Sequence, residues 1–115
     1  MRYILLALLF VAPLHAETIK FAWDKPTANA DGSPLILSGY RFYISPVPGA
    51  YGPSNALLGP ASLTYSFVVP EKMAGSKFYA TVTAYNQQGE SERSNELEFV
   101  TKPKPAPASG LRVAP

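Results

Sequence analysis

The chain has 115 residues, with ten Lys and Arg, eight Asp and Glu, one His and no Cys, and its formal net charge is +2. This length allows one small domain, and without Cys such a domain depends on its hydrophobic core rather than on disulfides. The near-neutral charge excludes the clustered basic surface that nucleic-acid binding requires.

Residues 1–16, MRYILLALLFVAPLHA, have the pattern of a secretory signal peptide. Arg2 precedes an apolar run from Tyr3 to Val11 that is too short to cross a bilayer as a helix, and Pro13 ends it. We expect cleavage after Ala16, although the residue three before the end of this segment is Leu rather than a small residue. The mature chain is then secreted or periplasmic and does not insert into a membrane; an uncleaved anchor is the alternative.

Cleavage would remove Arg2 and His15 and leave nine basic and eight acidic side chains, a net charge of +1. Without His, the mature chain lacks the usual general base, the commonest metal ligand and the partner of a Ser or Cys nucleophile. It has no Gly-rich phosphate loop and no G-x-S-x-G motif. We therefore expect no catalytic residues, no cofactor and no metal site. Composition leaves Ser–Lys chemistry open, but no motif supports it, and the chain is predicted not to be an enzyme.

Segments that alternate apolar and polar residues recur along the mature chain, which is the pattern of half-buried strands. The expected strands are 18–23, 39–45, 56–58, 62–70, 77–85 and 95–101. The residues expected to face inward on the fourth and sixth strands are Leu63, Tyr65, Phe67, Val69, Leu97, Phe99 and Thr101. On the fifth strand the expected inward residues are Phe78, Ala80, Val82 and Ala84.

Turn-forming residues separate these strands. Asp31-Gly32 supplies a turn within 27–34, Pro and Gly interrupt 46–55, the chain reverses at 73–76, and 86–94 is a polar loop. No segment shows a helical period of useful length. Short strands between frequent turns predict an all-β sandwich. Its expected core is Trp23, Tyr40, Phe42, Phe67, Phe78 and Val82.

From Thr18 to Thr101 the chain resembles a fibronectin type III domain. The most specific stretch is KFYATVTAYNQQGESERSNE, supported by the strand that ends in Trp23 and by GYRFYIS and YSFVV. The likeness is greatest to single-domain versions in secreted bacterial and phage proteins. It implies a fibronectin type III-like β-sandwich that acts as a binding, adhesive or spacer module rather than as a catalyst.

Two features depart from the family pattern. The family has a Tyr where this chain has Phe78, so the hydrogen bond of the tyrosine corner is lost, at a cost of about 1 kcal/mol. The first strand of the family is also missing before the strand that carries Trp23. Its usual sequence resembles residues 105–115, PAPASGLRVAP. The predicted organisation is therefore a signal peptide at 1–16, a domain at 17–102 and a Pro-rich tail at 103–115 that resembles a displaced first strand.

The tail has three possible fates. It could be disordered, as Pro-rich termini often are. It could fold back on its own domain as the missing strand, or it could add as a strand to a neighbouring copy in a head-to-tail assembly. We hypothesise strand addition in one of the last two ways, with Leu111 and Val113 as the donor residues.

Tyr43, Tyr79 and Tyr85, beside Arg41, are expected on the outer face of the larger sheet, where they could bind a sugar or a protein. They could equally be ordinary cross-strand stabilisers. The loops predicted to carry binding residues contain Asn29, Asp31, Gln87, Gln88 and Glu90.

Two acidic patterns are better explained by local structure than by a metal-binding or catalytic site. NADGS at 29–33 is similar to the start of a calcium loop, but the acidic residues that complete one are absent, so a tight turn is favoured. Glu96 and Glu98 lie two residues apart on an expected edge strand, where such charges discourage association between sheets.

The function predicted from these observations is an exported, non-catalytic binding or adhesion module with an unknown protein or polysaccharide partner. The alternatives are a structural subunit that assembles head-to-tail through its C-terminal strand and a carbohydrate-binding accessory domain. Self-association through that strand is a further expected interaction, and no nucleic-acid partner is expected.

Overall fold

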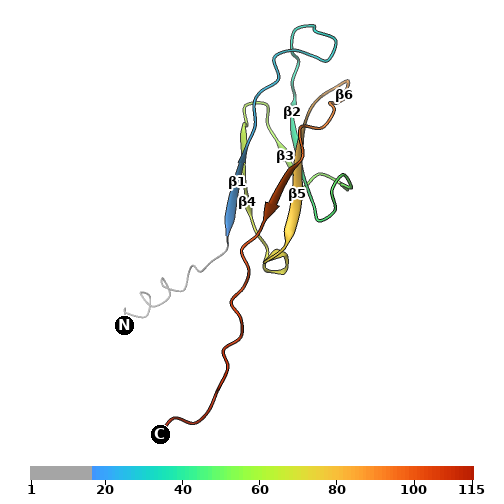
Figure 1. Cartoon of the computed structure of the whole chain (residues 1–115). Helices are drawn as coiled ribbons and strands as arrows, with labels where there is room; N and C mark the ends of the chain where they lie inside the picture. The colour runs from blue at the N-terminus through green and yellow to red at the C-terminus, as the bar shows by residue number, and fades with distance from the viewer. Residues whose placement is uncertain (1–16) are drawn as a thin grey trace, which may run out of the picture.

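The computed structural model describes residues 17–115, which form two packed antiparallel sheets followed by an extended tail (Figure 1). The predicted signal peptide lies outside the described residues. The two-stranded sheet pairs β1 (Thr18–Ala22) with β4 (Thr64–Val68). The five-stranded sheet contains β3 (Ala56–Leu58), β2 (Gly39–Ser45), β5 (Lys77–Asn86), β6 (Gly89–Glu90) and β7 (Leu97–Val100). Both β6 and β7 pair with β5, and the described part of the chain contains no helix that could span a membrane.

The core lies between the two sheets, where the alternating apolar residues of β1, β2 and β5 meet. Phe21, Phe42 and Ala80 form its buried centre. The ring of Phe21 packs against that of Phe42 at a centroid distance of 4.8 Å and edge-on against that of Phe99 at 5.2 Å. Of the core predicted from the sequence, Tyr40, Phe42 and Phe78 are buried. The other three predicted core residues are only half-buried: Trp23, Phe67 and Val82.

Most strands have the expected positions, but some details of the prediction are wrong. The first strand ends at Ala22, the expected strand 62–70 forms only from Thr64 to Val68, and the 3₁₀ turn η1 (Glu71–Met73) and the short β6 were not expected. Leu63 and Leu97 were expected to face inward, yet they are 39% and 48% exposed. Leu63 precedes β4, and Leu97 lies at the rim of an open groove.

The pairing register along β5 shifts by two residues between β6 and β7. Tyr85 is opposite Glu90, whereas Ala80 is opposite Leu97, so segment 91–96 is two residues longer than the part of β5 that it faces. Extra residues in one strand bend it away from its partner. Segment 91–96 therefore forms an irregular wall between β6 and β7.

The domain is closed at the end of β7 by hydrogen bonds around Thr101 and Lys102. Thr101 is 1% exposed and its Oγ1 accepts a hydrogen bond from the Ser76 N–H at 3.0 Å. The Lys102 N–H donates to Glu17 Oε1 at 2.8 Å, and its carbonyl accepts from the Gly75 N–H at 2.9 Å. From residue 103 onward the chain is exposed, belongs to no regular element and runs away from the sandwich (Figure 1).

Candidate functional site

One edge of β1 is unpaired in the described part of the chain, where no strand precedes β1 and β4 is its only partner. At one end of this pair the Trp23 N–H donates to the Leu63 carbonyl at 3.1 Å, and at the other end the Val69 N–H donates to the Glu17 carbonyl at 2.8 Å. Residues in an antiparallel pair alternate between the two edges of a strand. The residues whose backbone N–H and C=O groups point to the open edge are therefore Thr18, Lys20 and Ala22.

A groove of about 540 Å³ runs between the end of β1 and segment 91–97. Its apolar lining comes from both sheets and includes Phe21, Trp23, Tyr40, Phe42, Val82 and Leu97. The volume is within the range of ligand-binding clefts in proteins. Because the groove opens onto the core, it accounts for the partial exposure of Trp23 and Val82.

Two polar atoms of the groove lining are buried without a hydrogen-bond partner within residues 17–115: Trp23 Nε1 and Tyr40 Oη. Burial raises the pKa of the Tyr40 hydroxyl above its usual value, and the Trp23 indole N–H opposes this shift in part. The two groups are neighbours, but their geometry does not meet that of a hydrogen bond. An unsatisfied buried group costs about 1–3 kcal/mol, so these two atoms lower the stability of the domain.

Serine hydroxyls hold the far wall of the groove. The Ser91 and Ser94 N–H groups donate to carbonyls of β5, as in a regular strand. In the other direction, the Ala84 N–H donates to Ser91 Oγ and the Val82 N–H donates to Ser94 Oγ, both at 3.0 Å. Because the hydroxyls replace backbone acceptors, segment 91–96 stays attached to β5 although it bulges. Two serines three residues apart are the one sequence feature that could have indicated this arrangement.

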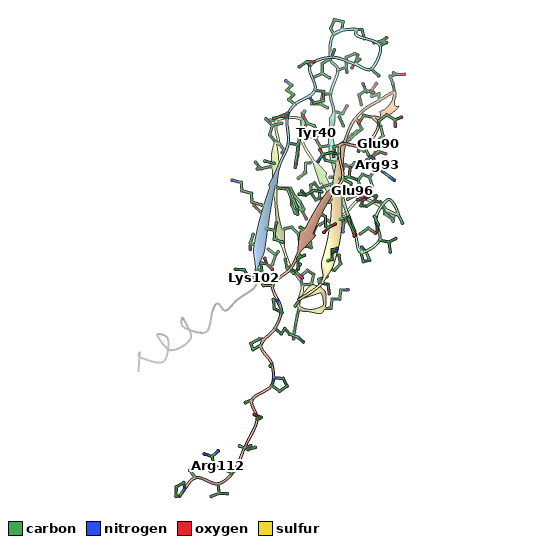
Figure 2. All side chains as sticks on the ribbon, viewed as in Figure 1. Tyr40, Glu90, Arg93, Glu96, Lys102 and Arg112 are labelled. Atoms are coloured by element: carbon green, nitrogen blue, oxygen red, sulfur yellow. The ribbon has the colours of Figure 1, made fainter. Side chains whose placement is uncertain are left out.

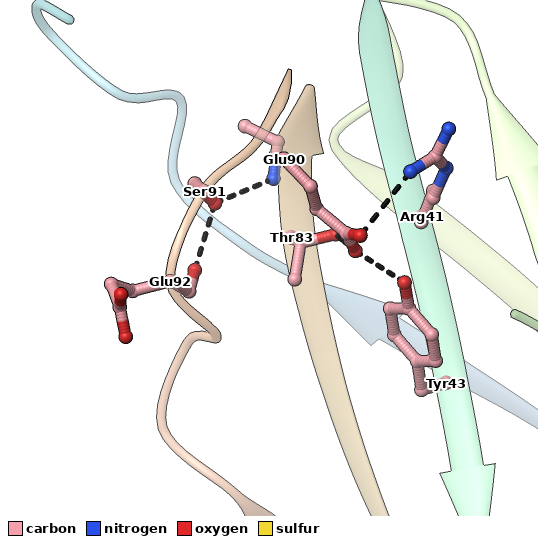
Figure 3. A network of polar contacts seen from close by, with 7 residues as sticks. Arg41, Tyr43, Thr83, Glu90, Ser91 and Glu92 are labelled. Atoms are coloured by element: carbon pink, nitrogen blue, oxygen red, sulfur yellow. Dashed lines mark hydrogen bonds and ion pairs between the residues drawn. The ribbon is translucent and has the colours of Figure 1, made fainter. Parts of the chain in front are cut away.

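A second cluster lies on the outer face of the larger sheet and is centred on Glu90 (Figure 3). The Glu90 carboxylate accepts hydrogen bonds from Thr83 Oγ1 and Tyr43 Oη, and from Arg41 Nη1 at 3.2 Å. The bonds from Thr83 and Tyr43 are the main reason that the pKa of the Glu90 carboxyl is below its usual value. Arg41, Tyr43 and Glu90 were predicted as candidate binding residues in separate groups, and the structure joins them into one network.

The outer tyrosines are less available than the sequence predicts. Tyr43 lies on the outer face of the larger sheet, yet it is only 9% exposed. Glu90 covers its hydroxyl, and the Tyr51 ring packs edge-on against its ring at 6.1 Å. The Arg41 guanidinium lies 4.5 Å from the centroid of the Tyr85 ring. Tyr79 is half-buried between its strand neighbours in β2 and β7.

The candidate loops meet at one end of the sandwich, where the Asn86 side chain donates to the Ile36 carbonyl at 2.9 Å. The Asn29 side chain accepts from the Ile36 N–H at 3.0 Å and donates to the Pro34 carbonyl at 2.9 Å, which closes the loop on itself. Bonds from the Ser33 hydroxyl and N–H lower the pKa of Asp31. These side chains are used within the turn, and residues 17–115 contain no cluster of metal-ligating residues.

The remaining predicted loop residues, Gln87 and Gln88, are exposed at the tip of the turn between β5 and β6. There the Gln88 N–H donates to Asn86 Oδ1 at 2.8 Å, so a side chain of the turn itself stabilises the turn. Within the described residues, no side-chain hydrogen bond joins either glutamine to the Glu90 network.

Glu96 has a role that the sequence did not reveal. It precedes β7 and accepts hydrogen bonds from Tyr51 Oη at 2.6 Å and from the Gly49 N–H at 2.7 Å, and these bonds lower the pKa of its carboxyl. It thereby ties the β2–β3 loop to segment 91–96, and Arg93 lies over the Tyr51 ring at 4.9 Å. Figure 2 shows Glu90, Arg93 and Glu96 on the same side of the larger sheet. Glu98 instead pairs with Lys77 at 3.5 Å.

The predicted donor residues of the tail, Leu111 and Val113, are 101% and 96% exposed. Arg112 lies between them, far from the sandwich (Figure 2). The tail does not pair with β1 of its own chain in this structure. Within a single chain, the tail therefore fills neither the open edge of β1 nor the groove beside it.

Comparisons with known proteins establish the fold. No protein-family model and no curated protein matches the chain. The solution structure of the sixth fibronectin type III domain from human fibronectin type III domain containing protein 3 is similar, with a TM-score of 0.56 and 22% identity over 83% of this chain and 88% of that chain. The chain thus has a fibronectin type III-like β-sandwich fold, and a fold by itself does not determine function. The narrower likeness to secreted bacterial and phage versions finds no support in this match.

Proposed function

We propose that this chain is a non-catalytic protein-binding module that takes up an extended polypeptide segment along the open edge of β1. A strand added there could bond to the backbone groups of Thr18, Lys20 and Ala22. Every second side chain of the added strand would enter the groove, because side chains alternate between the two faces of a strand. Backbone bonds supply affinity in this mode of recognition, and the pockets for alternate side chains supply specificity.

The observation that carries the proposal is the apolar groove beside the Ala22 end of the open edge. An extended segment brings one N–H and one C=O for nearly every residue, so its backbone can bond along the open edge while alternate side chains enter the groove. The unpaired Trp23 Nε1 and Tyr40 Oη are themselves buried, so a segment in the groove does not reach them.

The outer face of the larger sheet is a weaker candidate. A sugar-binding surface needs free aromatic faces, yet Tyr43 is 9% exposed and Arg41 covers the Tyr85 ring. The polar groups there already bond to one another through Glu90. This network attaches the turn between β5 and β6 to the sheet, so its geometry favours a structural role.

The setting proposed for this module is outside the cytoplasm, either secreted or periplasmic, and it rests on the sequence of residues 1–16. In that setting, capture of an extended segment from a neighbouring protein is one way to achieve adhesion. The tail takes part in this proposed binding function only if it is the segment that the groove captures.

Trp23 provides the test, because it is the one tryptophan of the chain and lines the groove. Random extended peptides displayed on phage would be selected against the full chain, and the enriched peptides titrated while Trp23 emission is followed. We expect an emission change together with shifted amide resonances at Thr18, Lys20 and Ala22. If no enriched peptide moves either signal, strand capture at β1 is wrong.

A matched pair of variants identifies the edge in the same titration. Lys20→Pro removes an N–H that points to the open edge and should abolish the emission change, whereas Lys20→Ala keeps that N–H and should retain it. Pro is tolerated on the open side of an edge strand. Equal binding by the two variants would place the peptide elsewhere.

A further inference from the structure

We propose that the occupant of the groove is the C-terminal tail of a second copy of this chain, with Leu111 and Val113 inserted into it. This inference rests on the proposed function, because it names the segment that the open edge of β1 captures. It predicts an assembly in which each copy gives its tail to the next and receives a tail from the previous one.

The tail has the side-chain pattern that the groove requires. Leu111 and Val113 are two residues apart, so an extended backbone places them on one face and Arg112 on the other. Both apolar side chains are essentially fully exposed in the single chain. The groove offers aromatic and aliphatic lining to such side chains, from Phe21, Phe42 and Leu97 among others.

The direction of the tail favours a second copy over the tail's own domain. Antiparallel addition to β1 must start beside Ala22 and end beside Thr18. The tail leaves from the opposite end of the groove, because the Lys102 N–H is bonded to Glu17 Oε1, directly before β1. To fill its own groove, the tail would first have to travel back along the whole length of β1.

The composition of the tail also opposes such a reversal. Prolines at 103, 105 and 107 favour the stiff, extended polyproline conformation. At about 3.1 Å per residue, residues 103–109 reach about 22 Å from the domain, and in Figure 1 they point away from it. The chain bends at Gly110, which has a φ of 69°, immediately before Leu111. A copy placed beyond this end could receive Leu111 and Val113 at the Ala22 end of its own groove.

The resulting contact joins two different surfaces, a tail and a groove, so it is heterologous, and one such contact between two copies leaves one groove and one tail unused. In an open assembly the copy at one end retains a free groove and the copy at the other end retains a free tail. Growth is therefore expected to continue with concentration, and blocking either surface is expected to stop it.

The experiment is a complementation between two variants of the full mature chain, followed by light scattering over a range of concentrations. Leu111→Ser with Val113→Ser removes the apolar side chains of the tail and leaves the groove intact. Lys20→Pro blocks the edge and leaves the tail intact, and Leu97→Arg, at a half-exposed position of the groove rim, serves as a second blocked variant if Lys20→Pro fails to fold. The matched controls are Arg112→Ser and Lys20→Ala.

We expect concentration-dependent oligomers for the unmodified chain and for both controls. The tail variant should self-associate at least about a hundredfold more weakly, because two buried aliphatic side chains are lost. Each blocked variant should be a monomer. An equimolar mixture of the tail variant and a blocked variant should form a heterodimer and nothing larger, because only one tail and one groove remain functional.

Two results would overturn the proposal. An unmodified chain that is monomeric at every concentration, with Trp23 emission that changes in the tail variant, would mean that the tail fills its own groove. A mixture that stays monomeric while the tail variant still binds a phage-selected peptide would mean that the groove works but takes another segment. If the tail variant binds no peptide either, the proposed function fails as well, so the two failures are distinguishable.

Discussion

The indole of Trp23 and the ring of Tyr40 meet edge-on at a centroid distance of 5.4 Å, each with a buried polar atom that lacks a hydrogen-bond partner within residues 17–115. Aromatic pairs in this orientation stabilise a core, whereas unsatisfied polar atoms destabilise it. The pair therefore combines packing that stabilises the fold with buried polar groups that destabilise it.

Tyr40→Phe is expected to leave the stability of the domain unchanged or to raise it by about 1 kcal/mol, because it removes a buried hydroxyl that has no partner. Tyr43→Phe is the matched control and should lower stability by about 1 kcal/mol, because that hydroxyl donates to Glu90. Urea unfolding measures both. A larger loss for Tyr40→Phe than for Tyr43→Phe would show that the Tyr40 hydroxyl is bonded in solution.

Glu90→Gln is expected to destabilise the domain by about 1–3 kcal/mol at pH 7, because the carboxylate accepts bonds from Thr83, Tyr43 and Arg41. The pKa of Glu90 is lowered in the folded state, so its contribution is complete above its unfolded pKa of about 4.3 and is lost as the pH falls through the folded value. The stability difference between the unmodified chain and the variant should therefore shrink between pH 5 and pH 2.

The control for this pH dependence is Glu98→Gln. Glu98 pairs with Lys77 at 3.5 Å, and both side chains are more than half exposed. Exposed ion pairs contribute little, so this variant should change stability by less than about 0.5 kcal/mol. A Glu90 effect that is as small as that of Glu98, or that is the same at pH 2 and pH 7, would contradict the network in Figure 3.

Thr101→Val is expected to cost about 1–3 kcal/mol, because it removes the hydroxyl of a buried residue that bonds to the Ser76 N–H and the Met73 carbonyl. Thr18→Val, at an exposed strand position, should be nearly neutral. Thermal unfolding distinguishes the two. Equal melting temperatures for both variants would mean that the closure at the end of β7 contributes nothing to stability.

Gly39→Ala is expected to destabilise the domain by about 1–3 kcal/mol, because an added Cβ would lie 2.3 Å from the Leu58 carbonyl oxygen and 2.9 Å from the Tyr85 hydroxyl. Gly52→Ala meets nothing within 4 Å and should change stability by less than about 0.5 kcal/mol. Comparable losses in a denaturant titration would show that β2 and β3 separate more easily than this packing implies.

Alternation along the chain was sufficient to predict the strands and the sandwich. GYRFYIS forms β2 from Gly39 to Ser45, and the apolar positions Tyr40 and Phe42 are buried as expected. These features depend on neighbours in sequence, because each strand face is defined by every second residue. The same reasoning located the fold class without knowledge of any contact between distant residues.

The candidate sites depend on distant contacts, which alternation does not contain. It places Tyr43 outside the sandwich but does not show that Glu90, 47 residues later, covers its hydroxyl. It also treats 86–94 as a plain loop, whereas the Ser91 and Ser94 hydroxyls replace backbone acceptors and shift the register by two residues. The groove lies between that shifted segment and the end of β1, whose edge is open in residues 17–115. Of these two features, only the open edge was predicted from the sequence.

The bonds around Lys102 also determine how the domain responds to tension. A pull on the tail enters the sandwich where Lys102 is held by Glu17 and Gly75, at the end of β7 and the start of β1 (Figure 1). If the opposing load is a tail captured along β1, that tail enters at the Ala22 end, so the force acts along the strands. The ladder bonds lie perpendicular to the strands and would then be loaded in shear.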